Sequence, residues 1–342
     1  MVLTLNDAKR TAIAEKLADI RAVQNLIIEN EKEFIKVCDD SEIRDRFQHM
    51  LADDEKNIGV LETVITQYGI QEKPSKKTQE LVQKTQELMK GSKLSFYEKV
   101  VQHELLKHAQ FMAGVVVHKA AQVVGADVEV AITPLNTFNF ESRAHQEQLK
   151  GVLEVLGTRE LTGQEPDQSV WARVQDAIAA FSGVVGSAVT QNSHSSDLNI
   201  QEIIFADHRK ADTLMMEIEK SNDAQKIQEY FGQLYKDLSV HSEAEEQVVY
   251  PAIRSFYGEE NTQELYDEQA ELKTLLEKMK VMDMSEPAFK DDLKQVKSMV
   301  GDHTRQEEST MFAAIGKNYS KEKQEQLGSQ FKEAKKQLQI QM

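Results

Sequence analysis

The stretch that decides the fold of the C-terminal half is HSEAEEQVVYP, residues 241–251, in which a glutamate stands four residues after a histidine. A second stretch, HTRQEESTMF at residues 303–312, repeats this arrangement of imidazole and carboxylate. Residues four apart lie one turn along the same face of a helix, so each pair can bind a cation together. The repeat predicts two long helices with metal-ligating side chains on one face.

A third histidine, His208, precedes these stretches and lies on a separate predicted helix. With His241, His303, Glu245 and Glu307 it would bring neutral nitrogens and anionic oxygens into the core of a helical bundle. Iron and manganese are the metals that such a mixed set of ligands suits. We therefore expect a metal site in this half of the chain.

The hydrophobic pattern predicts helices throughout. Apolar residues recur at three- and four-residue spacing between the five widely separated prolines. The 5 prolines and 15 glycines in 342 residues are about half the share of an average protein, which argues against all-β and collagen-like folds. We predict an all-α fold of two helical bundles.

The chain is long enough for two domains, because a single hydrophobic core rarely keeps growing beyond about 300 residues. The stretch QNSHSSD, residues 191–197, contains no apolar side chain and is the predicted linker. We expect one domain over residues 1–190 and a second over residues 198–342. The second is predicted to be an up-down four-helix bundle, with helices near 198–220, 223–256, 262–282 and 287–314 and a further helix near 320–339.

The charge balance bears on partners and location. The formal net charge of −16 repels phosphate backbones and anionic lipid, so neither nucleic acid nor a membrane is an expected partner. No uncharged apolar run approaches the roughly 18 residues of a membrane span, and the N-terminus lacks the basic start of a signal peptide. Because Cys38 is the single cysteine, no intrachain disulfide can form. We expect a cytoplasmic protein.

The N-terminal half places acids and imidazoles on four successive predicted helices, which resembles a ferritin-like bundle. Ferritin-type di-iron sites need Glu-x-x-His on two of the helices. Here Glu104 precedes His108 by four residues, and Glu141 precedes His145 by four. We therefore predict a ferritin-like bundle whose metal site is degenerate or absent. A helix predicted over 168–190 is rich in small residues and suits packing between domains, or between chains of a homo-oligomer.

The segment FADHRKAD around His208, taken with the two His/Glu stretches, resembles the hemerythrin-like domains, the His-His-Glu cation-binding family. The resemblance covers about residues 198–338 in the family's order and spacing. It implies a di-iron centre in which His208 and His241 bind one iron and His303 the other. It also implies that Glu245 and Glu307 bridge the two irons.

The third helix departs from the family pattern, which reads Glu-His at this point. The present chain has Glu268-Gln269, with Lys273 one turn later. Glu268 and Gln269 are the candidate ligands from this helix, and Glu264 is an alternative reached by a rotated helix. Further alternatives are extra water on the second metal, a single metal, or pairing of Lys273 with a bridging carboxylate in place of a cation.

The resemblance implies a protein that binds iron, or manganese as the second choice, and that binds or senses oxygen, peroxide or nitric oxide or handles iron. A di-iron peroxidase or oxidase is the enzymatic alternative, because an incomplete ligand set leaves positions open for chemistry. A metal-free helical scaffold that binds a protein partner is the third hypothesis. The sequence assigns no catalytic residue, since fold alone does not fix function.

Overall fold

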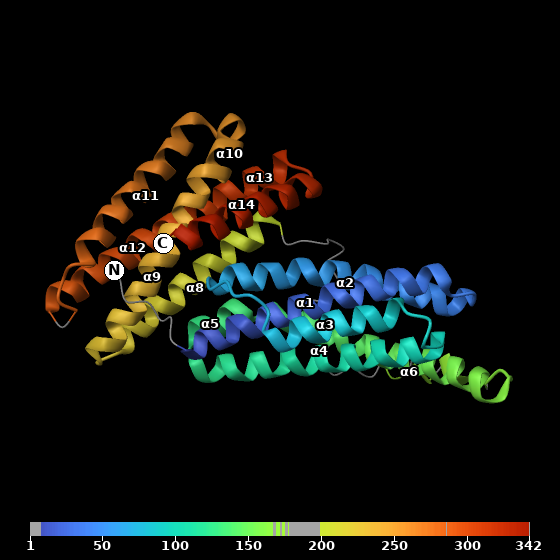
Figure 1. Cartoon of the computed structure of the whole chain (residues 1–342). Helices are drawn as coiled ribbons and strands as arrows, with labels where there is room; N and C mark the ends of the chain where they lie inside the picture. Colours follow the sequence, from blue (N-terminus) through green and yellow to red (C-terminus); the bar gives the residue numbers. More distant parts are fainter. Residues whose placement is uncertain are drawn as a thin grey trace.

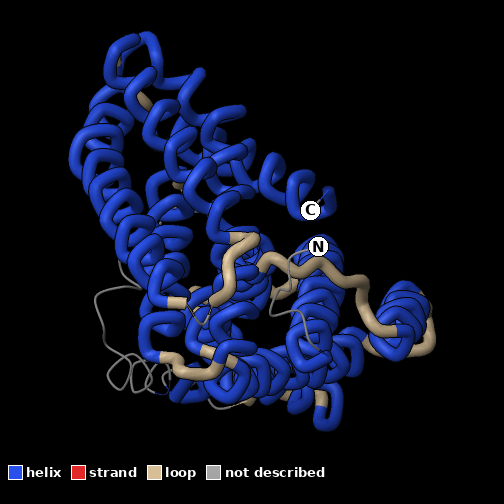
Figure 2. The backbone as a smooth tube through the Cα atoms, turned by 90° about the vertical axis from the view of Figure 1, so that its left-hand side faces the viewer, coloured by secondary structure: helices blue, strands red, loops and turns tan. Residues whose placement is uncertain are grey.

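The computed structural model describes residues 8–166, 169–171, 173–174, 177, 199–284 and 286–341. Over these residues the regular secondary structure is helical and contains no strand (Figure 2), which confirms the all-α prediction. Before residue 167 the helices are α1 (Ala8–Val37), α2 (Ser41–Tyr68), α3 (Lys76–Lys90), α4 (Phe96–Val124), α5 (Ala126–Ile132) and α6 (Leu135–Thr162). None of the described helices is long and apolar enough to cross a lipid bilayer.

From residue 200 on, the α-helices are α8 (Ile200–Lys220), α9 (Ala224–Ala244), α10 (Tyr250–Tyr257), α11 (Glu259–Met279), α12 (Pro287–Gln306), α13 (Phe312–Asn318) and α14 (Lys321–Gln341). Two short π-helical segments, η1 (Glu245–Val249) and η2 (Glu307–Met311), join α9 to α10 and α12 to α13. The predicted second and fourth helices of this half are therefore continuous, but each contains a π segment that the sequence pattern did not indicate.

Helices α1, α2, α4 and α6 pack on one another as a four-helix bundle, with α3 against α1. Local signals set its boundaries: Asp40 accepts a hydrogen bond from the Ile43 amide at the start of α2, and Ser95 with Glu98 forms a capping box at the start of α4. Gly69, at φ 81°, ends α2 in the left-handed region that favours glycine. Helix α5 was not predicted, and the helix predicted over 168–190 lies mostly outside the described residues.

The second bundle consists of α8, α9, α11 and α12, with α14 packed against α8 and α9. This is the predicted up-down arrangement with one appended helix. Figure 1 shows the two bundles beside each other with their long axes inclined, and α8 lying next to α5 and α2 of the first bundle.

Two apolar clusters fill the second bundle. One includes Leu214, Phe231 and Val296, and the other includes Ile204 and Ile253. Buried polar residues of α8, α9, α11 and α12 accompany these clusters. The polar centre described below is therefore enclosed by apolar side chains that exclude bulk water.

Polar contacts, buried or partly buried, join the two bundles at the carboxyl end of α2. Lys210 of α8 donates to the Gln67 carbonyl at 2.8 Å, and Gln339 of α14 donates to the Thr66 carbonyl at 3.0 Å. These carbonyls belong to the last turn of a helix, where the chain itself offers no amide donors and a cation is favourable. The predicted linker lies outside the described residues, so the domain division at 191–197 stays a prediction.

We expect Lys210→Met to lower the free energy of unfolding by about 1–3 kcal/mol, because it leaves the buried Gln67 carbonyl without its donor and Asp237 Oδ2 without its ion-pair partner. Urea unfolding followed by circular dichroism measures the effect. Lys297→Met, which removes an exposed pair with Glu219, is the matched control and should change stability by less than about 0.5 kcal/mol. Equal effects of the two substitutions would contradict this account of the junction.

Candidate metal centre

Four side chains converge in the core of the second bundle. His208 of α8, His241 of α9, Glu245 at the start of η1 and Glu307 at the start of η2 each offer one ligand atom, and these atoms lie within 4.8 Å of one another. All four side chains are buried. Among the described residues, no other group of three or more His, Cys, Asp or Glu side chains brings its ligand atoms this close together.

The backbone around the two glutamates explains how they come to face each other. In both helices the π segment begins at the glutamate of the HxxxE motif, and the amides of Tyr250 and Phe312 bond to the carbonyls of Glu245 and Glu307 five residues earlier. A π segment inserts one residue into a helical turn and is frequent at functional sites. Pro251 contributes to η1, because it has no amide hydrogen for the carbonyl four residues before it.

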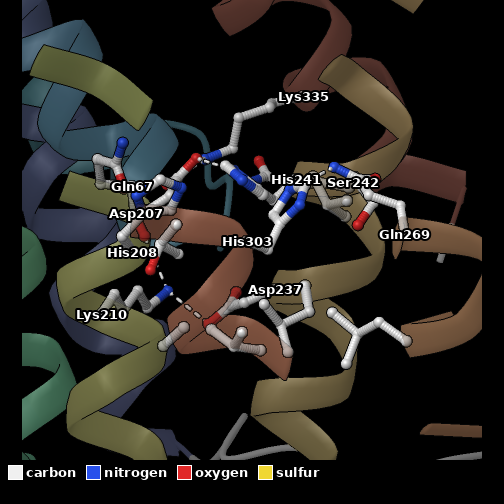
Figure 3. Close-up of a pocket in the computed structure, with 17 residues that line it drawn as sticks. Gln67, Asp207, His208, Lys210, Asp237, His241, Ser242, Gln269, His303 and Lys335 are labelled. Carbon is white, nitrogen blue, oxygen red and sulfur yellow. Dashed lines mark hydrogen bonds and ion pairs between the residues drawn. The ribbon is translucent and has the colours of Figure 1, made fainter. Parts of the chain in front are cut away.

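Each imidazole is oriented by a carboxylate on its outer nitrogen. His241 Nδ1 lies 3.0 Å from Asp207, His208 Nδ1 lies 2.8 Å from Glu308, and His303 Nδ1 lies 2.7 Å from Glu268. Asp207 in turn accepts from Lys335 of α14 at 2.6 Å. This arrangement leaves the Nε2 atoms directed inward, as in the carboxylate–histidine–metal pattern of metalloproteins. Figure 3 shows His208, His241 and His303 directed into the same space between the helices.

The four converging atoms lack the hydrogen bonds that buried polar atoms normally make. His208 Nε2, His241 Nε2, Glu245 Oε1 and Glu307 Oε2 have no aligned hydrogen bond among the described residues. Two of them lie within ion-pair distance of a carboxylate oxygen, since His208 Nε2 is 3.2 Å from Glu307 Oε2 and His241 Nε2 is 3.2 Å from Glu245 Oε2. Buried polar atoms without partners are rare. A divalent cation between them would satisfy two nitrogens and two anionic oxygens together, so the residues present fit a metal.

The other oxygen of each glutamate is hydrogen-bonded. Gln269 Nε2 donates to Glu245 Oε2 at 2.7 Å, and the Tyr250 hydroxyl donates to Glu307 Oε1 at 3.0 Å. Gln269 Nε2 also lies 3.3 Å from His303 Nε2. An amide and a phenol therefore contact the carboxylate oxygens on the side where a second metal would lie.

The remaining predicted ligands are near this centre but outside the converging group. His303 Nε2 lies 3.4 Å from Glu307 Oε1, on the side of Gln269. Glu268 bonds the outer nitrogen of His303, while Glu264 accepts from Gln306 at the surface. The alternative in which Lys273 pairs with a bridging carboxylate is wrong, because Lys273 pairs with Glu246 at 2.7 Å.

The buried charges shift the pKa values of the site. Burial alone would lower the pKa of His241, but Glu245 and Asp207 raise it to about 10. Burial would also lower the pKa of His303, but Glu307 and Glu268 raise it to about 11. Burial would raise the pKa of Glu307, but His303 and His208 hold it well below its usual value. Protons on the imidazoles thus supply the positive charge that a cation would supply.

A cavity of about 30 Å³ lies beside the centre and is lined by His208, His241, His303 and Gln269, with Gln67 from the first bundle (Figure 3). It has room for water-sized molecules and is far smaller than a nucleotide. Tyr250, Asp207 and Lys335 were missed by the sequence reasoning, which interpreted Tyr250-Pro251 as a helix end. The sequence offered one signal for Tyr250, which is its position five residues after Glu245.

In the first bundle, the Glu/His pairs considered in the sequence do not form a metal site. His108 is exposed, and Glu141 lies 3.6 Å from Lys56. His145 and Asp54 are buried but contact Lys107. The ferritin-like resemblance, with its degenerate or absent site, stays a prediction.

The family model described as the hemerythrin HHE cation binding domain matches residues 199–315. A protein of Nostoc sp. (strain PCC 7120) named DNA nickase is 61% identical over 339 residues, covering 99% of this chain and 97% of its own length. An uncharacterized hemerythrin-like protein of Schizosaccharomyces pombe is 29% identical over 140 residues, 40% of this chain and 69% of its own. No solved structure matches significantly.

Among ligand substitutions, we expect His241→Ala to weaken binding of Mn²⁺ or Fe²⁺ by at least about 100-fold, since it removes an inward nitrogen. His49→Ala, which changes an exposed histidine of the first bundle, is the matched control and should leave affinity unchanged. Gln269→His replaces the amide donor with a metal ligand and should raise the number of metals per chain. Equilibrium dialysis measures both the metal affinity and the number of metal ions per chain. A wild-type affinity in His241→Ala would refute the assignment.

The metal-free protein should lose stability as pH rises. A pKa raised to about 10 on folding contributes stability that is complete below the unfolded value of about 6.5 and disappears as pH rises through 10. With EDTA present, we expect the melting temperature to fall between pH 6.5 and 9.5. With Mn²⁺ present the fall should be smaller, because the metal replaces the protons. An EDTA-treated protein equally stable at both pH values would contradict the charge assignment.

Proposed function

We propose that this chain, which belongs to the family of the Nostoc protein and carries a hemerythrin HHE cation binding domain, binds one divalent cation through His208, His241, Glu245 and Glu307. The observation that carries the proposal is the convergence of four buried ligand side chains, which among the described residues contact one another at ion-pair distance but make no aligned hydrogen bond through these atoms. Iron is the first candidate and manganese the second, because both accept mixed imidazole and carboxylate ligands.

One cation is favoured over two by the groups on the far side of the carboxylates. Gln269 and Tyr250 donate hydrogen bonds to Glu245 Oε2 and Glu307 Oε1, the oxygens that a second metal would need. The dinuclear reading, in which His303 serves a second iron, requires both donors to move. We therefore propose that His303, Gln269 and Glu268 lie near the metal but do not coordinate it.

The cavity beside the centre supports a small ligand such as oxygen, peroxide or nitric oxide. An iron ion bound there would supply reversible binding or reduction of such a molecule. Tyr250 remains a proton donor toward the centre, because burial and the charges of Glu245 and Glu307 raise its pKa well above its ordinary value. The enclosing apolar clusters keep bulk water away from the same space.

A second proposed activity is the cutting of one strand of duplex DNA. The observation that favours it is the 61% identity to a protein named DNA nickase, which extends over both bundles. The net charge of −16 argues against DNA contact by the molecule as a whole. Residues 73–93, however, carry six exposed lysines against two exposed glutamates, along and around α3. This basic segment is the surface that we propose for phosphate contact.

The buried centre constrains how metal and DNA would be linked. A cavity of about 30 Å³ does not admit a nucleotide, so a DNA phosphate would not reach the four ligands in this conformation. Nicking that depends on the centre would therefore act through a small oxygen-derived product that leaves the cavity. Hydrolytic nicking would instead use a cation and water at the protein surface.

Conversion of supercoiled plasmid to the open circular form tests the nicking proposal. We expect conversion with Fe²⁺ or Mn²⁺ and none with EDTA. Lys76→Glu with Lys77→Glu should weaken it by about tenfold or more at 0.1 M salt, whereas Lys321→Glu with Lys323→Glu on α14 should not. Absence of nicking with every divalent metal tried would refute the proposed nicking activity.

The same assay separates the two routes. If the centre supplies an oxidant, His241→Ala and exclusion of oxygen should each abolish nicking. Nicking by His241→Ala at the wild-type rate would show that the buried centre is not used. Optical titration of the iron-loaded protein with nitric oxide tests ligand binding independently, and a spectrum unchanged by nitric oxide would refute it.

A further inference from the structure

A second buried polar cluster lies in the core of the first bundle. Its members are Glu31 of α1, Asp54 of α2, His103 and Lys107 of α4, and His145 of α6. None of these side chains is more than 1% exposed. All four helices of the bundle thus contribute to one enclosed group of acids, imidazoles and an amine.

The amine is at the centre of the group. Lys107 Nζ lies 3.0 Å from Glu31 Oε1 and 2.8 Å from His145 Nδ1, and it donates to Asp54 Oδ2. His103 Nε2 lies 3.2 Å from the same Glu31 oxygen. An ammonium has three hydrogens in a fixed tetrahedral arrangement, and here each meets a different helix. The atoms that receive them are of the types that ligate divalent metals.

The ligand-type atoms are also supported as metal ligands usually are. Gln24 donates to the second oxygen of Asp54 at 2.9 Å, and Asp53 lies 3.2 Å from His145 Nε2. Such outer contacts fix the orientation of ligating groups in metal sites. In addition, Glu31 Oε2 and His103 Nδ1 are buried without a hydrogen-bond partner among the described residues.

The charges require a cation at this place. Burial and the neighbouring Asp54 raise the pKa of Glu31 to about 8, although Lys107 opposes this rise, so two carboxylates at this place are costly unless a positive group compensates them. The Lys107 ammonium meets this need, and its charge helps to hold the pKa of Asp54 well below its usual value against the effect of burial.

We propose that the Lys107 ammonium takes the place of a metal ion in the first bundle, and that removing it opens a divalent cation site formed by Glu31, Asp54, His103 and His145. The proposal explains why a bundle with acids and imidazoles on all four helices lacks a metal-type motif. It concerns a different bundle and different residues from the hemerythrin-like centre.

A metal at the position of Lys107 Nζ would lie close to ligand atoms of Glu31, Asp54 and His145, and His103 contacts the same Glu31 oxygen. Metal–ligand bonds are about 2.0–2.2 Å long, so Glu31 and His145 would each move inward by less than about 1 Å. Two carboxylates and two imidazoles from four helices suit zinc, manganese or iron. Lys107→Ala vacates the space, whereas Lys107→Met removes the charge but fills the space with a side chain of similar length.

The experiment uses the full-length chain in four forms: wild type, Lys107→Ala, Lys107→Met, and Lys107→Ala combined with Asp54→Asn. Each is loaded with Zn²⁺ or Mn²⁺, desalted and assayed for metal per chain and melting temperature. We expect Lys107→Ala to hold one cation more than wild type and to gain about 5 °C or more on loading. Lys107→Met and the double variant should hold no more than wild type.

The results separate this proposal from that for the second bundle. If wild type binds no metal but Lys107→Ala binds one, the lysine proposal holds and the hemerythrin-like centre fails. A folded Lys107→Ala with no additional cation overturns the proposal. If Lys107→Ala folds only when Zn²⁺ or Mn²⁺ is supplied, the proposal is supported. Failure to fold with either metal also overturns it.

Discussion

The structure of the second bundle depends on the burial of two carboxylates, Glu245 and Glu307, in an apolar core. A buried negative charge is tolerated only when positive or hydrogen-bonding groups surround it. His208, His241, Gln269 and Tyr250 provide these groups. The π segments bring the glutamates to this position, and the outer carboxylates direct the imidazoles inward.

The first bundle meets the same constraint in another way. Glu31 and Asp54 are as deeply buried as the two glutamates of the second bundle, but the compensating charge is the covalently attached ammonium of Lys107. Under our proposals, one bundle takes its cation from solution and the other carries its own. Only a metal ion taken from solution leaves an open coordination position, so we expect a small ligand to bind in the second bundle and not in the first.

The helices themselves could be predicted because their signals are local. Periodic apolar residues predicted a helix near 198–220, which is observed as α8 over Ile200–Lys220, and the HxxxE repeat indicated that His241 and Glu245 share a face. The π segments could not be predicted, because each results from a shift of backbone hydrogen bonding to the carbonyl five residues earlier rather than from a change of residue type, and η2 forms without a nearby proline. Tyr250 was missed for this reason.

The long-range partners were also beyond the sequence pattern. Asp207 and Lys335 meet only because α14 folds back on α8, and no spacing rule connects residues 128 positions apart. Lys107 was not predicted as part of a polar cluster, because lysine is not a usual metal ligand and the Glu-x-x-His pattern does not include it. The chemistry of Gln269 was identified because the family resemblance marked the position where a histidine is usual.

X-ray absorption at the iron edge of the iron-loaded wild-type chain, combined with iron counted per chain, tests the central claim most directly. One iron per chain, with two imidazole nitrogens and carboxylate oxygens at about 2.0–2.2 Å and no neighbouring iron, is the predicted result. Two irons per chain with an iron–iron scattering shell would contradict the single-cation account. An iron environment without imidazole would contradict the assignment of His208 and His241.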